Sequence, residues 1–192
     1  MTVDVHWPDH LLTLEDWVAL PEDSSRSYEL VEGILVVSPR PVSQHQRAIW
    51  RLAAQLEPQL PRTHGVLTES EMVIEPGPYP TIRVPDVLVV PAAGIDANLS
   101  RWDAADVLLA VEILSVGSKR TDRVTKFFEY AEAGIEHYWL IDLDEPASLT
   151  AHRLIEGDYE LVAEQSGRAT LDLAGTPITI DITALTSNRA GR

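Results

Sequence analysis

The chain has 192 residues, of which 45% are hydrophobic, contains no cysteine and carries a formal net charge of −15. The length and composition fit one globular domain over residues 1–192, and the absence of cysteine excludes disulfides, thiolate metal sites and a cysteine nucleophile. The acidic balance argues against a broad basic face for nucleic acid, although carboxylates that hold metal ions raise the acidic count themselves.

Residues 1–27 are expected to form an N-terminal docking segment, with a short helix that begins near Thr13. This segment lacks the basic and apolar stretches of a secretory signal. No apolar run in the chain approaches the roughly 18 residues that a membrane span requires. We therefore expect a soluble, cytoplasmic protein that does not bind membranes.

The expected core, at about residues 28–142, contains both strands and helices. Residues 28–37 predict a hairpin that turns at Glu32-Gly33, and apolar residues at three-and-four spacing predict a helix over residues 43–60. Further strands are expected over residues 66–75, 84–90, 108–115 and 137–142, a second helix over residues 118–133, and an antiparallel extension over residues 151–162.

Two of these strands, residues 84–90 and 108–115, are nearly continuous apolar runs, which is typical of strands covered on both faces. The order of elements therefore predicts an α/β fold. Its core should have three layers, namely a helix, a mixed central sheet and a second helix. The N-terminal hairpin and the C-terminal antiparallel extension would be added to that core.

Two carboxylates interrupt these apolar strands. Asp86 begins the run Val87–Val90, and Glu112 lies inside the run 108–114. A buried charge needs a cation, a set of hydrogen bonds or access to water, and two such carboxylates on neighbouring strands could share one divalent metal ion. The alternative is that each lies at the end of its strand and faces solvent.

The ordered set of motifs resembles the Uma-type restriction endonuclease family of the PD-(D/E)XK nuclease superfamily. The resemblance extends from about Tyr28 to Asp142 and rests on Pro85-Asp86, Glu112-Ile113-Leu114-Ser115, Lys126, Tyr130 and the segment GIEHYWLID at residues 134–142. It implies a restriction-endonuclease-like fold. It also implies catalytic roles for Asp86 and Glu112, which would bind Mg²⁺ or Mn²⁺ with the backbone carbonyl of Ile113.

The superfamily places a lysine two residues after the motif glutamate, but this chain has Leu114 there. The resemblance implies that the lysine has migrated to the following helix, where Lys126 is the candidate third catalytic residue. Its four-carbon stem could carry the ammonium group to the metal site. The alternative is an ordinary surface ion pair between Lys126 and Asp122, four residues earlier.

Four further residues are weaker candidates. The resemblance implies that Glu32 lies near the metal, whereas the pattern alone makes it a hairpin-turn residue. His45, in the first turn of its helix, is a candidate contact for phosphate or substrate, as are Asp122 and Tyr130, which share one helix face with Lys126.

The leading functional hypothesis is a magnesium-dependent endonuclease that hydrolyses phosphodiester bonds in nucleic acid, in DNA more than RNA. Nuclease-fold proteins commonly dimerise, so a homodimer is expected, with Trp50 or Trp102 either at its interface or in the core. One alternative is a nuclease-fold binding module with little or no turnover, motivated by Leu114 and the acidic balance. Another is a metal hydrolase of small phosphate compounds, which would explain the acidic charge.

Overall fold

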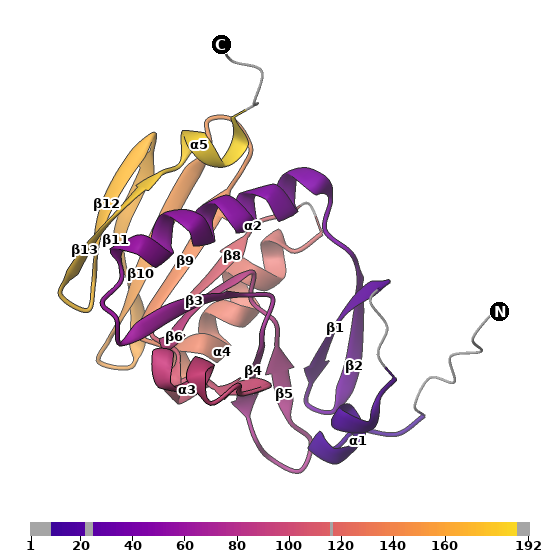
Figure 1. The fold of residues 1–192 in the computed structure, drawn as a ribbon. Helices are drawn as coiled ribbons and strands as arrows, with labels where there is room; N and C mark the ends of the chain where they lie inside the picture. The colour runs from indigo at the N-terminus through magenta and orange to yellow at the C-terminus, as the bar shows by residue number, and fades with distance from the viewer. Residues whose placement is uncertain (1–8, 22–24, 116, 188–192) are drawn as a thin grey trace.

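The computed structural model describes residues 9–21, 25–115 and 117–187 (Figure 1). The helices are α1 (Leu14–Ala19), α2 (Ser43–Leu56), α3 (Ala92–Asp96), α4 (Lys126–Glu132) and α5 (Thr183–Thr186), with 3₁₀ turns at Glu57–Gln59 and Ala104–Asp106 and a π-helical segment at Thr121–Thr125. The strands are β1 (Arg26–Val31), β2 (Ile34–Pro39), β3 (His64–Thr68), β4 (Glu71–Glu75), β5 (Thr81–Arg83), β6 (Val87–Pro91), β7 (Arg101–Asp103), β8 (Leu109–Ile113), β9 (His137–Asp142), β10 (Ser148–Ile155), β11 (Asp158–Ser166), β12 (Arg168–Leu173) and β13 (Thr176–Asp181).

The central sheet has six strands in the order β11-β10-β9-β8-β6-β3. Strands β8 and β9 are parallel and the other neighbours are antiparallel, so the sheet is mixed. The apolar runs are buried, as their composition predicts: every residue of β8 is buried, and so are residues 87–90 of β6. The mixed central sheet is therefore confirmed.

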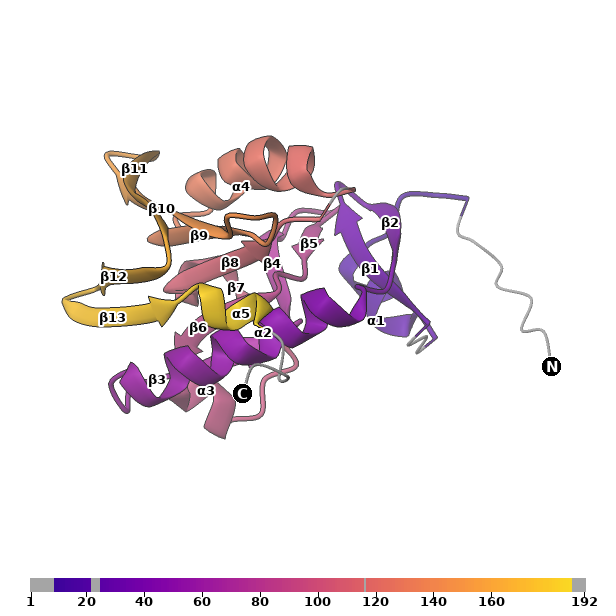
Figure 2. The same cartoon turned by 90° about the horizontal axis from the view of Figure 1, so that it is seen from above.

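Helices α2 and α4 lie on opposite faces of this sheet (Figure 2). Side chains alternate along each strand, so Val87 and Val89 pack in the same core as α2, whereas Leu88 and Val90 pack in the core that contains α4 residues. This is the expected arrangement of three layers. None of the helices in the part of the chain described here is long and apolar enough to cross a membrane.

A second sheet, in the order β2-β1-β5-β4-β7, stands beside the first. It contains the predicted hairpin, whose turn residues Glu32 and Gly33 both have positive φ angles of 49° and 78°. The N-terminal segment docks on this sheet through α1, where Trp17 packs in a small core and its indole N–H donates to Glu71 Oε2 at 3.1 Å.

The prediction of a single strand over residues 66–75 is wrong. The chain turns at Glu69, which has a φ angle of 50°, and divides the segment into β3 of the central sheet and β4 of the second sheet. Periodicity along the sequence does not show this break, because both halves alternate in the same way.

The C-terminal extension is longer than predicted. Strands β10 and β11 form the expected antiparallel pair, and a further hairpin, β12–β13, follows it. This hairpin shares a core with α2, and two glutamines, one in α2 and one in the 3₁₀ turn that follows it, bond to the backbone at the unpaired edge of β13. The amide and carbonyl of Thr179 bond to Gln59, and those of Asp181 bond to Gln55, at 2.7–3.3 Å.

Candidate active site

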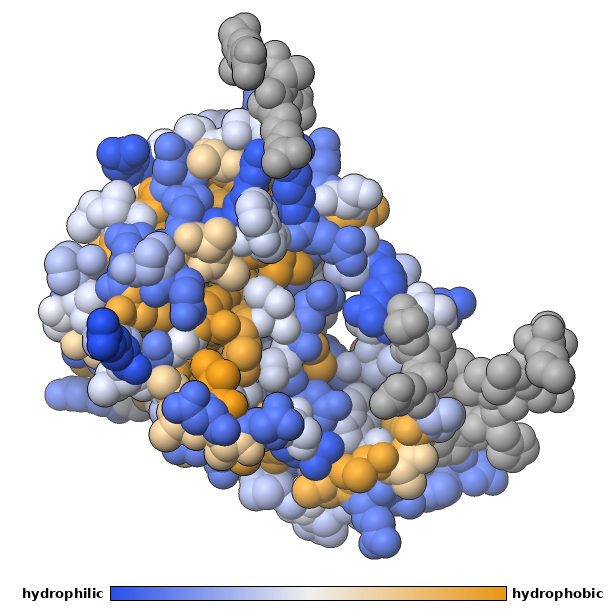
Figure 3. All heavy atoms as spheres, in the orientation of Figure 1, coloured by the Kyte–Doolittle hydropathy of each residue, from blue (hydrophilic) through white to orange (hydrophobic). Residues whose placement is uncertain are grey.

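A cavity of about 1010 Å³ lies between the β1–β2 hairpin and the central sheet. Figure 3 shows the surface hollowed between the part of the molecule that contains α2 and the part that contains the hairpin. Six of the predicted site residues line the cavity: His45, Asp86, Glu112, Ile113, Asp122 and Lys126. Residues from positions 45 to 126 of the chain are thus brought to one place.

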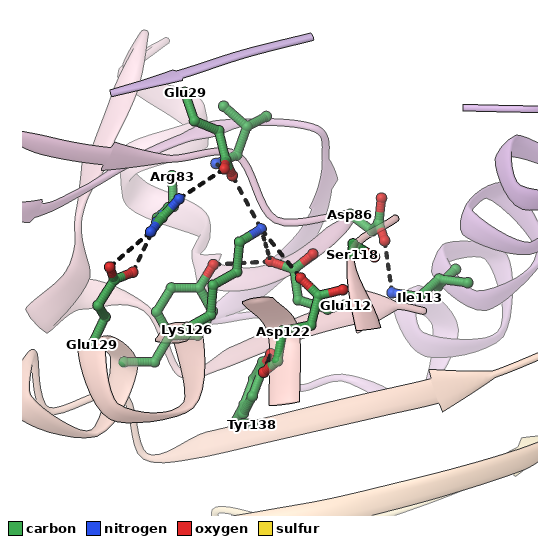
Figure 4. Close-up of polar contacts among 12 residues, drawn as sticks. Glu29, Arg83, Asp86, Glu112, Ile113, Ser118, Asp122, Lys126, Glu129 and Tyr138 are labelled. Atoms are coloured by element: carbon green, nitrogen blue, oxygen red, sulfur yellow. Dashed lines mark hydrogen bonds and ion pairs between the residues drawn. The ribbon is translucent and has the colours of Figure 1, made fainter. Parts of the chain in front are cut away.

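Asp86 and Glu112 reach this cavity from neighbouring strands. Val87 of β6 pairs with Val111 of β8, and continuing that register places Asp86 opposite Glu112. Asp86 Oδ2 accepts a hydrogen bond of 2.6 Å from the amide of Ile113, which ties the carboxylate to the end of β8 (Figure 4). The expected convergence of the two carboxylates is therefore present.

Lys126 points into the same group of carboxylates (Figure 4). Its Nζ lies 2.8 Å from Glu112 Oε1, 3.0 Å from Glu29 Oε1 and 3.7 Å from Asp122 Oδ1. Only 6% of the residue is exposed, so the alternative of an ordinary surface pair with Asp122 is excluded. The ammonium group therefore forms ion pairs with three carboxylates at once.

The helix that carries Lys126 begins with a π-helical segment, which has more residues per turn than an α-helix. Residues Thr121–Thr125 are π-helical, and the amide of Lys126 donates to the carbonyl of Thr121. Such π turns are rare in proteins overall, and many of those that occur lie at functional sites. The extra residue changes the direction of the side chains that follow. Here the π turn contains Asp122 and immediately precedes Lys126, so it helps to aim both toward the cavity.

Burial and charge act in opposite directions on these groups. Burial alone would lower the pKa of Lys126, but the carboxylates of Glu112, Glu29 and Asp122 outweigh burial and raise that pKa. Burial raises the pKa of Glu112 to about 8, although the Lys126 ammonium acts in the other direction. Lys126 therefore stays charged, and Glu112 holds its proton more firmly than an ordinary glutamate.

Asp122 is nearly inaccessible, with 1% of the residue exposed. Burial raises its pKa, and its Oδ2 atom has no hydrogen-bond partner among the residues that the structure describes. A buried carboxylate oxygen without a partner is costly. This atom is one that a bound cation or an ordered water would satisfy.

Glu29 is a site residue that sequence reasoning missed. It lies in β1, and its carboxylate accepts hydrogen bonds from Arg83 Nη1 at 2.9 Å and from the amide of Val84 at 3.1 Å. Arg83 also donates two hydrogen bonds to Glu129. Burial would raise the pKa of Glu29, but Lys126 and Arg83 together lower it. Its one signal in the sequence is a charge inside the apolar stretch of the hairpin.

His45 is more buried than a first-turn histidine usually is, with 9% of the residue exposed. Its Nε2 lies 3.0 Å from Asp86 Oδ1. Burial would lower the pKa of His45, but its hydrogen bond to Asp86 and the charge of that carboxylate raise it. His45 therefore contacts a candidate metal ligand directly, in addition to lining the cavity.

Two predicted candidates are not on the cavity wall. Glu32 lies in the turn of the hairpin, where its amide donates to the Thr81 hydroxyl, and Glu29 of the same hairpin lines the cavity instead. Tyr130 is fully buried behind Glu112, and its hydroxyl donates to Glu112 Oε1 at 2.9 Å. We correct both assignments: Tyr130 orients a carboxylate and does not reach a substrate, because the α4 core encloses its ring.

The residues present fit a divalent cation. Four of the carboxylates that line the cavity lie close together: Glu29, Glu112 and Asp122 are around the Lys126 ammonium, and Asp86 is opposite Glu112. Within residues 9–21, 25–115 and 117–187, no group of three or more His, Cys, Asp or Glu side chains is arranged as a metal cluster. Mg²⁺, however, is commonly held by one or two carboxylates and completes its shell with water. The unpartnered oxygen of Asp122 is consistent with such a shell.

The three layers, which are helix α2, the mixed central sheet and helix α4, form a restriction-endonuclease-like fold. A crystal structure described as that of a putative nuclease from Anabaena variabilis ATCC 29413 superposes with a TM-score of 0.71 at 21% sequence identity, over 91% of this chain and 97% of that chain. This likeness is evidence for the fold alone. No curated protein matches the chain at a significant level.

The family described as "Putative restriction endonuclease", Uma2, matches residues 14–184. The chain belongs to this family, which is the family that its motifs resemble. The match extends through α1 and the β12–β13 hairpin, beyond the segment 28–142 that carries the resemblance. Family and fold together make the chain a nuclease-type protein.

Proposed function

We propose that the protein hydrolyses phosphodiester bonds in nucleic acid and that it requires Mg²⁺ or Mn²⁺ to do so. The observation that carries this proposal is the meeting of Asp86, Glu112 and Lys126 in one cavity, from two strands and a helix. In this proposal Asp86 and Glu112 hold the cation, with the backbone carbonyl of Ile113 as a further ligand. The membership of the chain in the Uma2 family supports it.

A bound divalent cation lowers the pKa of its water ligand and neutralises charge on a phosphate. The protein's own groups would supply the rest. Lys126 is held charged by its carboxylates and can donate to a phosphate oxygen or to the attacking water. His45 bonds to one oxygen of Asp86 and so fixes the orientation of that carboxylate. Tyr130 does the same for Glu112.

The test is cleavage of supercoiled plasmid and of labelled oligonucleotides with Mg²⁺ or Mn²⁺, followed by gel electrophoresis. We expect Asp86→Asn and Glu112→Gln to reduce cleavage at least about 100-fold, because each removes the charge of one of the two proposed metal ligands. The matched control is Glu164→Gln on β11, an exposed acid away from the cavity, which should cleave like the native protein. Equal cleavage by all four proteins would refute the assignment.

The rival hypothesis is a binding module without turnover. The observation that favours it is Leu114, which occupies the position of the usual lysine. Calorimetric titration with Mn²⁺ separates the two hypotheses. The rival predicts no metal affinity, whereas our proposal predicts binding that Asp86→Asn abolishes and Glu164→Gln leaves intact.

A further inference from the structure

The basic side chains in the cavity wall are largely neutralised. Five of them line the cavity: Arg26, Arg40, Arg83, Arg101 and Lys126. Four form an ion pair with a carboxylate: Arg40 with Glu69 at 3.5 Å, Arg83 with Glu29 at 2.9 Å, Arg101 with Glu71 at 3.2 Å and Lys126 with Glu112 at 2.8 Å. Little positive charge therefore remains to neutralise a series of phosphates, as binding along a duplex requires.

The reactive groups are also recessed. Glu112 and Asp122 are 4% and 1% exposed, and a scissile phosphate must come close to them. A flexible single strand can bend to bring one phosphate down to these recessed groups, whereas a stiff duplex, with its phosphates on the outside of a wide cylinder, approaches them less easily.

The remainder of the wall is suited to bases. The apolar part of the wall comes from the segment after α1 and from the hairpin: Leu20, Pro21, Tyr28, Leu35 and Val36. Proteins that bind single strands pack unstacked bases on aromatic side chains, in addition to their contacts with the backbone phosphates. A wall that joins apolar side chains to a carboxylate cluster matches that mode of binding better than it matches a duplex backbone.

We infer that the substrate of this cavity is a single nucleic-acid strand, or an unpaired stretch within a duplex, and not an intact double helix. This inference rests on the proposed function, since it assigns the form of the substrate that the same carboxylates would cleave.

The first experiment compares one labelled 30-nucleotide strand in three forms, namely single-stranded, fully paired, and paired except for a central unpaired bubble. With Mn²⁺ we expect the single strand to be cut at least about tenfold faster than the duplex, and cuts in the third form to fall within the bubble. A single-stranded RNA of the same sequence shows whether the sugar matters. Equal or faster cutting of the full duplex overturns the inference but leaves the proposed function intact. No cutting of any form, with Glu112→Gln as the blank, overturns the proposed function.

The second experiment measures binding without cleavage, by fluorescence anisotropy of the same strands with Glu112→Gln. We expect tighter binding of the single strand and a shallow salt dependence, with a slope of log affinity against log salt of about −1 to −2, because most basic side chains of the cavity are already paired with carboxylates and few remain to neutralise phosphates. A slope near −5 or steeper, or preference for the duplex, contradicts the inference whatever the cleavage result.

The third experiment alters the wall itself. Val36→Asp places a carboxylate on the cavity wall beside the proposed path of the strand, and should weaken single-strand binding at least about tenfold. The matched control is Ile34→Asp on the same strand, at an exposed position outside the cavity, which should bind as the native protein does. Equal weakening by both variants, or by neither, counts against this wall as the binding surface.

Discussion

Lys126 joins three carboxylates that come from different elements of the chain. Glu112 is on the central sheet, Glu29 is on the hairpin and Asp122 is one turn earlier on the same helix. A lysine placed two residues after Glu112 would lie on the same strand. Lys126, on the helix that faces the strand, contacts Glu112 and also contacts Glu29 of the hairpin. Loss of Lys126 should therefore affect the stability of the fold as well as the proposed cleavage.

We expect Lys126→Met to abolish cleavage and to destabilise the fold in a pH-dependent way. Removing the ammonium leaves its carboxylates buried without a cation, and breaking a buried pair costs about 3–5 kcal/mol. Their folded-state pKa values then rise, so protonation relieves the cost at low pH. The free energy of unfolding, measured with urea, should fall by more at pH 8 than at pH 5. A loss that is equal at both values would contradict this account.

The raised pKa of Glu112 leads us to expect a second pH dependence of the free energy of unfolding. Its pKa is raised to about 8 in the folded protein from an ordinary value of 4.5, so folding favours its protonated form. The corresponding stability is present below the unfolded pKa and is lost as pH rises toward 8.

Glu112→Gln does not titrate and should remove this loss. In the presence of a chelator, its free energy of unfolding should exceed that of the native protein by about 1–3 kcal/mol at pH 8 and by much less at pH 5. Glu164→Gln, at an exposed position, should follow the native curve throughout. A native-like pH slope in Glu112→Gln would show that Glu112 is ionised in the folded protein.

At the scale of whole elements, helix α2 protects the edge of a sheet. Strand β13 pairs with β12 on one side only, and an unpaired edge invites association with other chains. Gln55 of α2 and Gln59 of the 3₁₀ turn that follows it bond to the amides and carbonyls of two alternate residues of β13 and so act as a neighbouring strand would.

We expect the double substitution Gln55→Leu and Gln59→Leu to lower the free energy of unfolding by about 2–4 kcal/mol, because four backbone groups lose their partners. The open edge should also promote association, which light scattering would detect. Gln46→Leu, at an exposed position on the same helix, is the matched control and should change neither quantity. A double variant that stays as stable and as monodisperse as the control would contradict this role.

The elements that could be predicted from the sequence are those with a local signal. The hairpin turn, the two covering helices and the buried strands each follow from turn residues or periodicity, and Asp86 and Glu112 are conspicuous as charges within apolar runs. Glu29 is also a charge within an apolar stretch, but the pattern does not distinguish it from Glu32, and its partner Arg83 is 54 residues away. The break at Glu69 depends on tertiary packing, whereas the β12–β13 hairpin has a local signal in its alternating apolar residues and its turn at Ala174-Gly175 that the prediction did not use.

For the whole molecule, the distribution of charge matters more than its total. The net charge of −15 repels phosphates at long range, and a divalent cation in the carboxylate cluster would offset that repulsion where cleavage is proposed. Of the two tryptophans considered for an interface, Trp102 is buried in the core and Trp50 is 67% exposed. The homodimer stays a prediction, now with Trp50 as the candidate contact.

The hairpin joins the rest of its sheet at one paired position, Leu30 with Ile82. Further bonds add to this pairing: the amide of Gly33 donates to the carbonyl of Pro80, and the Glu29 side chain bonds to Arg83, Val84 and Lys126. The ion pairs of Glu29 with Arg83 and Lys126 therefore belong to the proposed active site and also hold the hairpin against the rest of the cavity wall. A chain that exchanged Glu29 during evolution would thus change the aperture and the reactivity in a single step, so these two properties are expected to diverge together among its relatives.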